Sequence, residues 1–574
     1  MNALVLALIG VAIMLGGYFL YSKYLGSRIY RLNASFRTPA HTLEDGVDYV
    51  PTNRYVLWGH HFTSVAGAAP IVGPAIAVIW GWVPAFLWVT IGTVFIAGMH
   101  DFGALWASAR HRGQSIGTLS GTYIGRNGRN LFLVIIFLLL LMVNAAFAVV
   151  IAKLLVSTPT SVIPTWGAVI VALLIGQAIY RLKWNLPLVS LVGVVTLYAL
   201  MLVGDSLPVT LPETILGLNP NGFWIVVLFL YAGVASLLPV WVLLQPRDYI
   251  NGLQLFVGLI ILYGSVALSL PTLVAPTFNT QLPEGTPSMV PLLFVTIACG
   301  AISGFHGLVS SGTSSKQIDK ETDERFVGYF GAVGEGLLAL GAIIATCAGY
   351  QTVTQWREVY SAFGKGGVGA FVEGGSGIIH AGLGLPSSLS ATILATMAVL
   401  FAATTMDTGV RLQRLVVQEI GGHLGVKLSN ITATVTVLVV ALALTFSSGG
   451  DGSGGLVIWP LFGTTNQLMA ALTLCIICII LIRLRRPYRM VLIPMVFVMA
   501  VSVWALVIQL GTFYGSGNWM LLTLDVIILV AAVWIIVASV SAMRDAMASP
   551  AITDAEFDKA TAVTDGVDTH ARVQ

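Results

Sequence analysis

The chain has 574 residues, of which 57% are hydrophobic and only 9% are charged. Because an ordinary globular domain carries about 25% charged residues, this composition excludes a soluble protein and predicts an all-α integral membrane protein. The formal net charge of +3 does not indicate a nucleic-acid partner; the partner implied is the lipid bilayer.

Apolar runs long enough to cross a bilayer predict about 15 transmembrane helices, beginning near residues 3, 62, 83, 131, 165, 187, 222, 252, 290, 327, 387, 429, 456, 490 and 519. After the tenth run, residues 366–384 are too short to span and too apolar for a simple loop, which predicts an extracellular helical hairpin. Residues 545–574 are polar and predict a disordered cytoplasmic tail.

The distribution of basic residues supports this order of spans. With the N-terminus outside and the C-terminus in the cytoplasm, all but three of the 28 Lys and Arg residues fall on the cytoplasmic side. The exceptions are Lys153, Arg357 and Lys365. Cytoplasmic loops of membrane proteins carry an excess of Lys and Arg, so the pattern predicts this orientation.

Glycine and proline interrupt two of the apolar runs, at residues 67–74 and 299–307. A break at membrane depth frees backbone groups that lipid cannot satisfy, so it is tolerated only where it lines a cavity or binds a ligand. Two such breaks in separate parts of a chain indicate a transporter binding site.

Each break opens a set of five helices, and the two sets have opposite orientations, which predicts an inverted repeat. The predicted parts are a first helix and cytoplasmic loop (1–61), a first five-helix repeat (62–204), an inserted helix pair (205–289), a second five-helix repeat (290–482), two C-terminal helices (483–544) and the tail (545–574).

Several long motifs resemble the bacterial carbon starvation protein A family. They lie at residues 54–74, 98–103, 110–117, 310–317, 404–409 and 462–467, and the resemblance covers almost the whole chain. It implies a secondary transporter of peptides or pyruvate in the bacterial inner membrane. It also implies a leucine-transporter-like core of five plus five helices, in agreement with the inverted repeat.

The two breaks form the predicted substrate site. A broken helix exposes N–H groups and the positive end of a dipole, which suit the carboxylate that pyruvate and peptides share. His306 could also donate to the substrate or carry a proton, or bond a freed backbone carbonyl instead. The substrate-binding candidates are Gly67, Ala68, Ala69, Gly73, Ser303, Gly304, His306 and Gly307.

Glu335 is an acid well inside a predicted span, where a carboxylate is costly unless it is functional or paired. It is either a proton relay or a structural partner of a neighbouring polar group. In the fold implied by the resemblance, Thr404 and Thr405 lie on a helix that supplies hydroxyls to a sodium site closed by carbonyls of the first broken helix, and oxygen ligands suit a hard cation. Asp407 either joins them or pairs with Arg411 one turn on. The ion-coupling candidates are therefore Glu335, Thr404, Thr405 and Asp407.

His60, His61, His100 and Asp101 superficially resemble metal ligands but lack a recognised ligand spacing. We expect them to bond near the cytoplasmic interface, as part of an inner gate, and predict no metal site. We also expect no cofactor, only a coupling ion, H⁺ by preference with Na⁺ possible.

No nucleotide-binding or nucleophile motif is present in the sequence, which argues against an enzyme. The sequence therefore predicts a secondary active transporter that imports peptides or pyruvate during starvation, coupled to protons. The alternatives are a sodium-coupled symporter of a related carboxylate, a membrane metalloenzyme and a nutrient sensor. The choice between peptide and pyruvate, the coupling ion, the oligomeric state and metal binding by the group of His60, His61, His100 and Asp101 stay open.

Overall fold

The computed structural model describes residues 1–423, 425–554 and 556–557. Within these ranges the chain forms helices and three isolated β-bridges, with no β-sheet. The α-helices are α1 (Ala3–Gly16), α2 (Ser22–Tyr24), α3 (Pro39–Thr42), α4 (Arg54–Ala66), α5 (Ala69–Ala77), α6 (Trp82–Gly92), α7 (Gly98–Ala109), α8 (Ile116–Tyr123), α9 (Arg126–Ser157), α10 (Val162–Gly176), α11 (Leu186–Ser206), α12 (Pro220–Leu237), α13 (Leu244–Ser269), α14 (Met289–Thr296), α15 (Ala298–Ala301), α16 (Gly304–Gly312), α17 (Phe330–Ala348), α18 (Val353–Val359), α19 (Gly367–Leu383), α20 (Ser387–His423), α21 (Asn430–Thr445), α22 (Gly454–Val457), α23 (Trp459–Arg483), α24 (Arg489–Gly515) and α25 (Trp519–Ala548).

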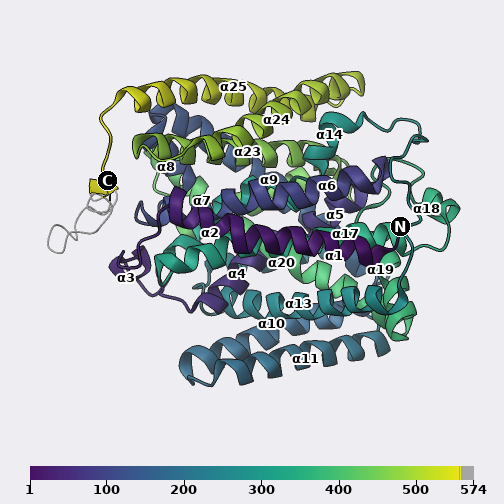
Figure 1. Ribbon diagram of the computed structural model, residues 1–574. Coiled ribbons are helices and arrows are strands. Elements are labelled where there is room, and N and C mark those ends of the chain that lie inside the picture. Colours follow the sequence, from purple (N-terminus) through teal and green to yellow (C-terminus); the bar gives the residue numbers. More distant parts are fainter. Residues whose placement is uncertain (424, 555, 558–574) are drawn as a thin grey trace.

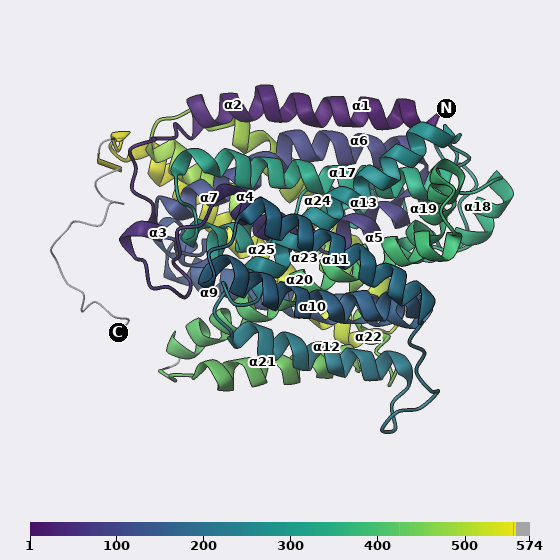
Figure 2. The same ribbon diagram turned by 90° about the horizontal axis from the view of Figure 1, so that it is seen from below.

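The long helices run side by side in one bundle, with the N-terminus at one end of the bundle and the C-terminal segment at the other (Figures 1 and 2). Helix α23 is enclosed by its neighbours, because the most apolar window of its span is 100% buried. Helix α11 lies at an edge of the bundle, where only 22% of the corresponding window is buried. The exposed side chains of α11 include Leu188, Leu191 and Val192, an apolar surface that suits lipid.

Twelve helices among the described residues are long and apolar enough to cross a membrane, and the bent pair α4 and α5 makes a thirteenth. Two of the 15 predicted spans do not meet this measure. The span predicted from residue 290 is divided into α14, α15 and α16, none longer than nine residues. The span predicted from residue 429 is α21, which has only 16 residues. The count of 15 is therefore not confirmed by helix length.

Two sequence predictions about local structure are wrong. Residues 366–384 do not form a hairpin, because Gly367–Leu383 is one continuous helix, α19, that ends at the left-handed Gly384. The predicted disordered tail begins too early, because α25 continues to Ala548. Asp554 then forms ion pairs with Arg31 and Arg486. Residues 558–574 of the predicted tail lie outside the described residues.

Candidate functional site

The first broken helix is interrupted between α4 and α5. Helix α4 ends at Ala66, and Gly67 adopts a left-handed φ of 55° before α5 begins at Ala69, with the axes bent by 44°. Glycine reaches this conformation without a steric penalty. A Cβ on Gly67 would also lie 2.8 Å from the Thr405 hydroxyl. This position therefore requires glycine both for its backbone angle and for close packing.

The second broken helix is interrupted between α15 and α16, where Ile302 and Ser303 are extended. The side chain of Asn466, on α23, caps the new helix, because its Oδ1 accepts from the Phe305 N–H at 2.9 Å and from the Ser303 hydroxyl at 3.2 Å. A Cβ on Gly304 would collide with the backbone of α23 at Asn466. Asn466 was not among the predicted site residues, although an amide in an apolar helix could have indicated it.

The two broken helices pack against each other. In the second helix, the residues that make this contact (296–300) precede the break at Ile302 and Ser303. A Cβ on Gly73 would collide with the Thr296 carbonyl oxygen, and a Cβ on Gly300 would lie 3.2 Å from Pro74. Residues 303–307 do not face residues 67–73 across this contact, because they are held by α23 and α7. Ala68 and Ala69 are buried beside the first break, and a Cβ on Gly307 would lie 3.1 Å from the His100 ring.

A buried chain of acids and histidines joins the second break to two neighbouring helices. Asp101, on α7, lies between two imidazoles, with His100 Nδ1 at 2.7 Å and His306 Nδ1 at 2.8 Å. The other ring nitrogen of His306, Nε2, lies 3.2 Å from Glu335 Oε2 on α17. All four side chains are at most 2% exposed. The structure thus brings Glu335 and His306, which the sequence analysis treated separately, into direct contact, with Asp101 on the other side of the His306 ring.

The histidines and Asp101 that were expected near the cytoplasmic interface are buried within the bundle, where each ring has a polar partner. His60 bonds Asp248 at 2.7 Å, His61 bonds Ser314 at 2.8 Å, and His100 bonds Asp101. Their relative exposures are all 0%. Among the residues that the structure describes, no group of three or more His, Cys, Asp or Glu residues is arranged to hold a metal ion.

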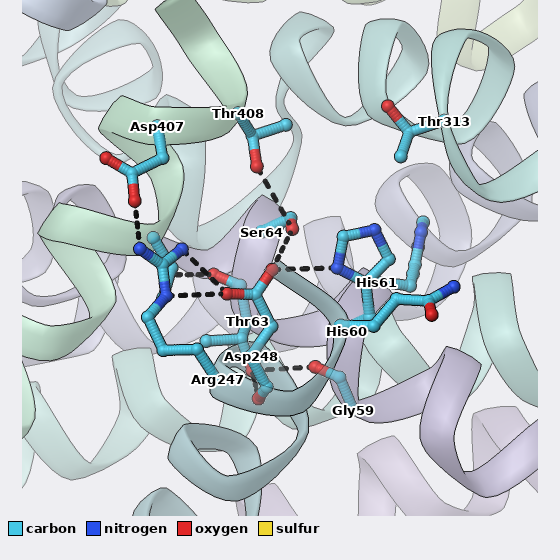
Figure 3. A network of polar contacts seen from close by, with 12 residues as sticks. Gly59, His60, His61, Thr63, Ser64, Arg247, Asp248, Thr313, Asp407 and Thr408 are labelled. Carbon is cyan, nitrogen blue, oxygen red and sulfur yellow. Dashed lines mark hydrogen bonds and ion pairs between the residues drawn. The ribbon is translucent and has the colours of Figure 1, made fainter. Parts of the chain in front are cut away.

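A second buried network joins α4, α13 and α20 (Figure 3). Arg247 lies between two carboxylates, forming ion pairs with Asp407 and, at 2.8 Å, with Asp248. Asp248 also accepts from Ser64 at 3.1 Å and lies 2.7 Å from His60. Of the two alternatives for Asp407, the pairing with Arg411 is not formed, because Asp407 is 1% exposed and pairs with Arg247. The sequence analysis missed this network because it placed Arg247 in a cytoplasmic loop.

Thr404 and Thr405 lie beside the first break, as predicted. Their hydroxyls donate to the Thr63 and Ser64 carbonyls in the last turns of α4, each at 3.0 Å. The Thr408 and Ser64 hydroxyls lie 3.3 Å apart, which links this contact to the network in Figure 3. A cation ligated by these carbonyls and hydroxyls would have to replace both hydrogen bonds.

The fold and the site define a class of protein. A multi-pass helical bundle with two broken helices in contact, and with buried ionisable groups beside them, is typical of secondary transporters. The profile of the family described as "Carbon starvation protein CstA" matches residues 2–356 and 350–505. The chain therefore belongs to the CstA family.

Named relatives agree with this assignment. The chain is 30% identical to "Peptide transporter CstA" of Campylobacter jejuni, over 90% of this chain and 81% of the relative. It is 29% identical to "Pyruvate/proton symporter BtsT" of Escherichia coli K12, over 90% and 84%. Among solved structures, an Eremococcus coleocola manganese transporter has a TM-score of 0.47 at 11% identity and covers 88% of this chain and 99% of its own.

Proposed function

We propose that this protein imports a small carboxylate-bearing nutrient, pyruvate or a short peptide, together with protons. The observation that carries the proposal is the buried chain from Asp101 through His306 to Glu335. It joins α7, the broken helix α16 and α17, and its members can exchange a proton at the contact between His306 and Glu335. The names of the relatives, a peptide transporter and a pyruvate/proton symporter, support this substrate class and this ion.

The coupling follows from the cost of charge in the core. A charged Glu335 is stable only beside a protonated His306, because an unpaired charge in a dry interior is costly. Proton uptake by Glu335 removes that attraction and leaves His306 held by Asp101 alone, so α16 can separate from α17. His306 lies in the first turn of α16, directly after the second break. A substrate at that break would therefore lie beside the group that this step releases.

The substrate carboxylate binds where the broken helices meet. Helix α5 begins at Ala69 without a side-chain cap. Pro70 has no N–H, and the Ile71 and Val72 N–H groups donate to the Ala68 carbonyl, so the Ala69 N–H is the donor of this turn that an anion would use. Gly67, Ala68, Ala69 and Gly73 provide this surface on the first helix. Ser303, Gly304, His306 and Gly307, at the break of the second helix, complete the proposed site.

The alternative of sodium coupling receives less support. Thr404 and Thr405 already donate to the carbonyls that would ligate the ion, so they stabilise the first break without one. Asp407 is paired with Arg247 and acts as a connection between α20 and α13. We assign proton coupling to Glu335 and His306. Thr404 and Thr405 are assigned a structural role, in which they hold α20 against the last turns of α4.

We further infer 15 membrane crossings in a leucine-transporter-like core, with the N-terminus outside. The N-terminus and the C-terminal end of α25 lie at opposite ends of the bundle (Figure 1), and this arrangement requires an odd number of crossings. Adding α14–α16 and α21 to the 13 spans gives 15. A membrane-impermeant thiol reagent should label Thr280→Cys in intact cells but not Lys427→Cys; the reverse labelling would invert the proposed orientation.

The experiment that tests the function is uptake into proteoliposomes. Labelled pyruvate and a labelled dipeptide are offered separately under a proton gradient, a sodium gradient and neither. The proposal expects accumulation of at least one substrate under the proton gradient, abolished by a protonophore. Accumulation under the sodium gradient alone would contradict proton coupling, and downhill flux without accumulation would indicate a channel.

A further inference from the structure

A cavity of about 740 Å³ leads from one end of the bundle toward the contact between the broken helices. Its lining includes Val72 on α5 and Thr296 on α14. Val72 precedes Gly73 in the chain, and Thr296 is the residue whose carbonyl oxygen a Cβ on Gly73 would meet. The helices that line the cavity include α14, and α19 begins at its edge; both lie toward the N-terminal end of the bundle in Figure 1. We call this cavity the vestibule.

The vestibule has positive charges in apolar walls. Lys153, near the end of α9, and Lys365, just before α19, both line it, and both are exposed. No Asp or Glu occurs among the lining residues that the structure describes. Most of the remaining lining is apolar, including Ile76, Leu292 and Trp459. Low-dielectric walls concentrate the field of charges inside a cleft, so the two lysines make the vestibule attractive to anions.

The two lysines differ from most basic residues of the chain in the side of the membrane on which they are predicted to lie. The chain has only three basic residues that the positive-inside pattern assigns to the outer face, and two of them, Lys153 and Lys365, meet in the vestibule. The third, Arg357, lies on α18 and does not line it.

The groups near the two lysines leave a net positive charge. The Lys365 ammonium contacts the Ser361 hydroxyl at 3.2 Å. The pKa of Asp451 is lowered by hydrogen bonds from Ser453 and, to a lesser extent, by the charge of Lys153, so this exposed carboxylate lies within reach of the Lys153 charge. The lining residues themselves carry two positive charges.

We propose that the vestibule is an anion-recruiting subsite, in which Lys153 and Lys365 select a substrate with net negative charge before it reaches the broken helices. This inference rests on the proposed function and narrows it to a small monocarboxylate such as pyruvate. A zwitterionic dipeptide gains little, because attraction of its carboxylate is offset by repulsion of its ammonium group. The lysines act at a distance from the site, so they should change KM rather than kcat.

The transport test compares Lys153→Gln with Lys365→Gln, singly and together, and uses Arg357→Gln as the matched control. The double variant should raise the KM for pyruvate about tenfold at low ionic strength, the lower end of electrostatic steering effects, with kcat unchanged. The salt dependence of KM should largely disappear. Dipeptide uptake and the Arg357→Gln protein should be unaffected. A double variant with wild-type KM and salt dependence would overturn the proposal.

A second measurement reports on the vestibule without transport. Ser157 lines the vestibule and is exposed, whereas the four native cysteines are buried. The thiol of Ser157→Cys should react faster with an anionic than with a cationic methanethiosulfonate, and this preference should fall about tenfold in the double lysine variant. Equal rates in both backgrounds would overturn the anion subsite. A wild-type protein that accumulates neither substrate but keeps the reagent preference would refute the proposed function and leave the anion subsite standing.

Discussion

Replacing Glu335 with Gln removes one titratable group from the core and keeps the volume of the side chain. The pair that is lost is His306 Nε2 to Glu335 Oε2 at 3.2 Å, while His306 keeps its 2.8 Å contact with Asp101. Because His306 is not left unpaired, we expect a loss of stability of about 1–3 kcal/mol. This is smaller than the roughly 3–5 kcal/mol for breaking a buried ion pair outright.

The functional effect should be larger than the structural one. One proton per pyruvate sustains about tenfold accumulation for each unit of pH difference, because one pH unit corresponds to 1.36 kcal/mol. Glu335→Gln should reduce this ratio to one while substrate exchange continues, since binding at the breaks is retained. Counterflow and proton-driven uptake are measured side by side on the same purified protein in proteoliposomes.

Asp525→Asn is the matched control. Asp525 is a fully buried carboxylate on α25, and neither of its oxygens has a hydrogen-bond partner among the described residues. It lies outside the chain of Asp101, His306 and Glu335, so its neutralisation should leave accumulation unchanged. Normal accumulation by Glu335→Gln would refute the reasoning. Loss of coupling in Asp525→Asn but not in Glu335→Gln would move the proton path to α25.

Three further predictions concern the first break and the second network. Gly67→Ala should lower the free energy of unfolding by about 1–3 kcal/mol and stop uptake, because Gly67 has a left-handed φ and its Cβ would lie against the Thr405 hydroxyl. The control Gly264→Ala should have neither effect, because there is open space around Gly264. The double variant Thr404→Val and Thr405→Val should lose about 1 kcal/mol of folding stability for each hydrogen bond removed and should keep sodium-independent uptake. If sodium stimulated uptake by the wild type but not by this variant, proton coupling would be contradicted. Asp407→Asn should destabilise the protein by about 3–5 kcal/mol, and adding Arg247→Met should recover part of this loss in a thermal unfolding assay; strictly additive losses would argue against the ion pair.

Much of the first break could be predicted from the sequence because it depends on a single segment. Residues 67–74 combine two glycines and two prolines within an apolar run, and such a segment cannot form one straight helix in lipid. The meeting of Thr404 and Thr405 with α4 was also predicted, but only through the family resemblance. Their hydrogen bonds to the Thr63 and Ser64 carbonyls agree with it.

The buried networks were only partly predicted. Glu335 and His306 were each singled out because ionisable groups in apolar segments are costly, yet nothing local indicated that Asp101 would join them. Asp248 gave no signal at all, because it follows Arg247 in a predicted cytoplasmic loop, where a charge is ordinary. The structure buries both residues and pairs them with His60 and Asp407.

The sequence by itself determined the membrane class, the approximate spans and the positions of the two breaks. These follow from hydropathy and from glycine and proline, whose effects act within one segment. The tertiary structure decided which ionisable side chains meet, that residues 367–383 form one helix, and that the vestibule brings Lys153 and Lys365 together. Such contacts depend on the rotation and axial position of each helix against its neighbours, and these are set by packing summed over many side chains.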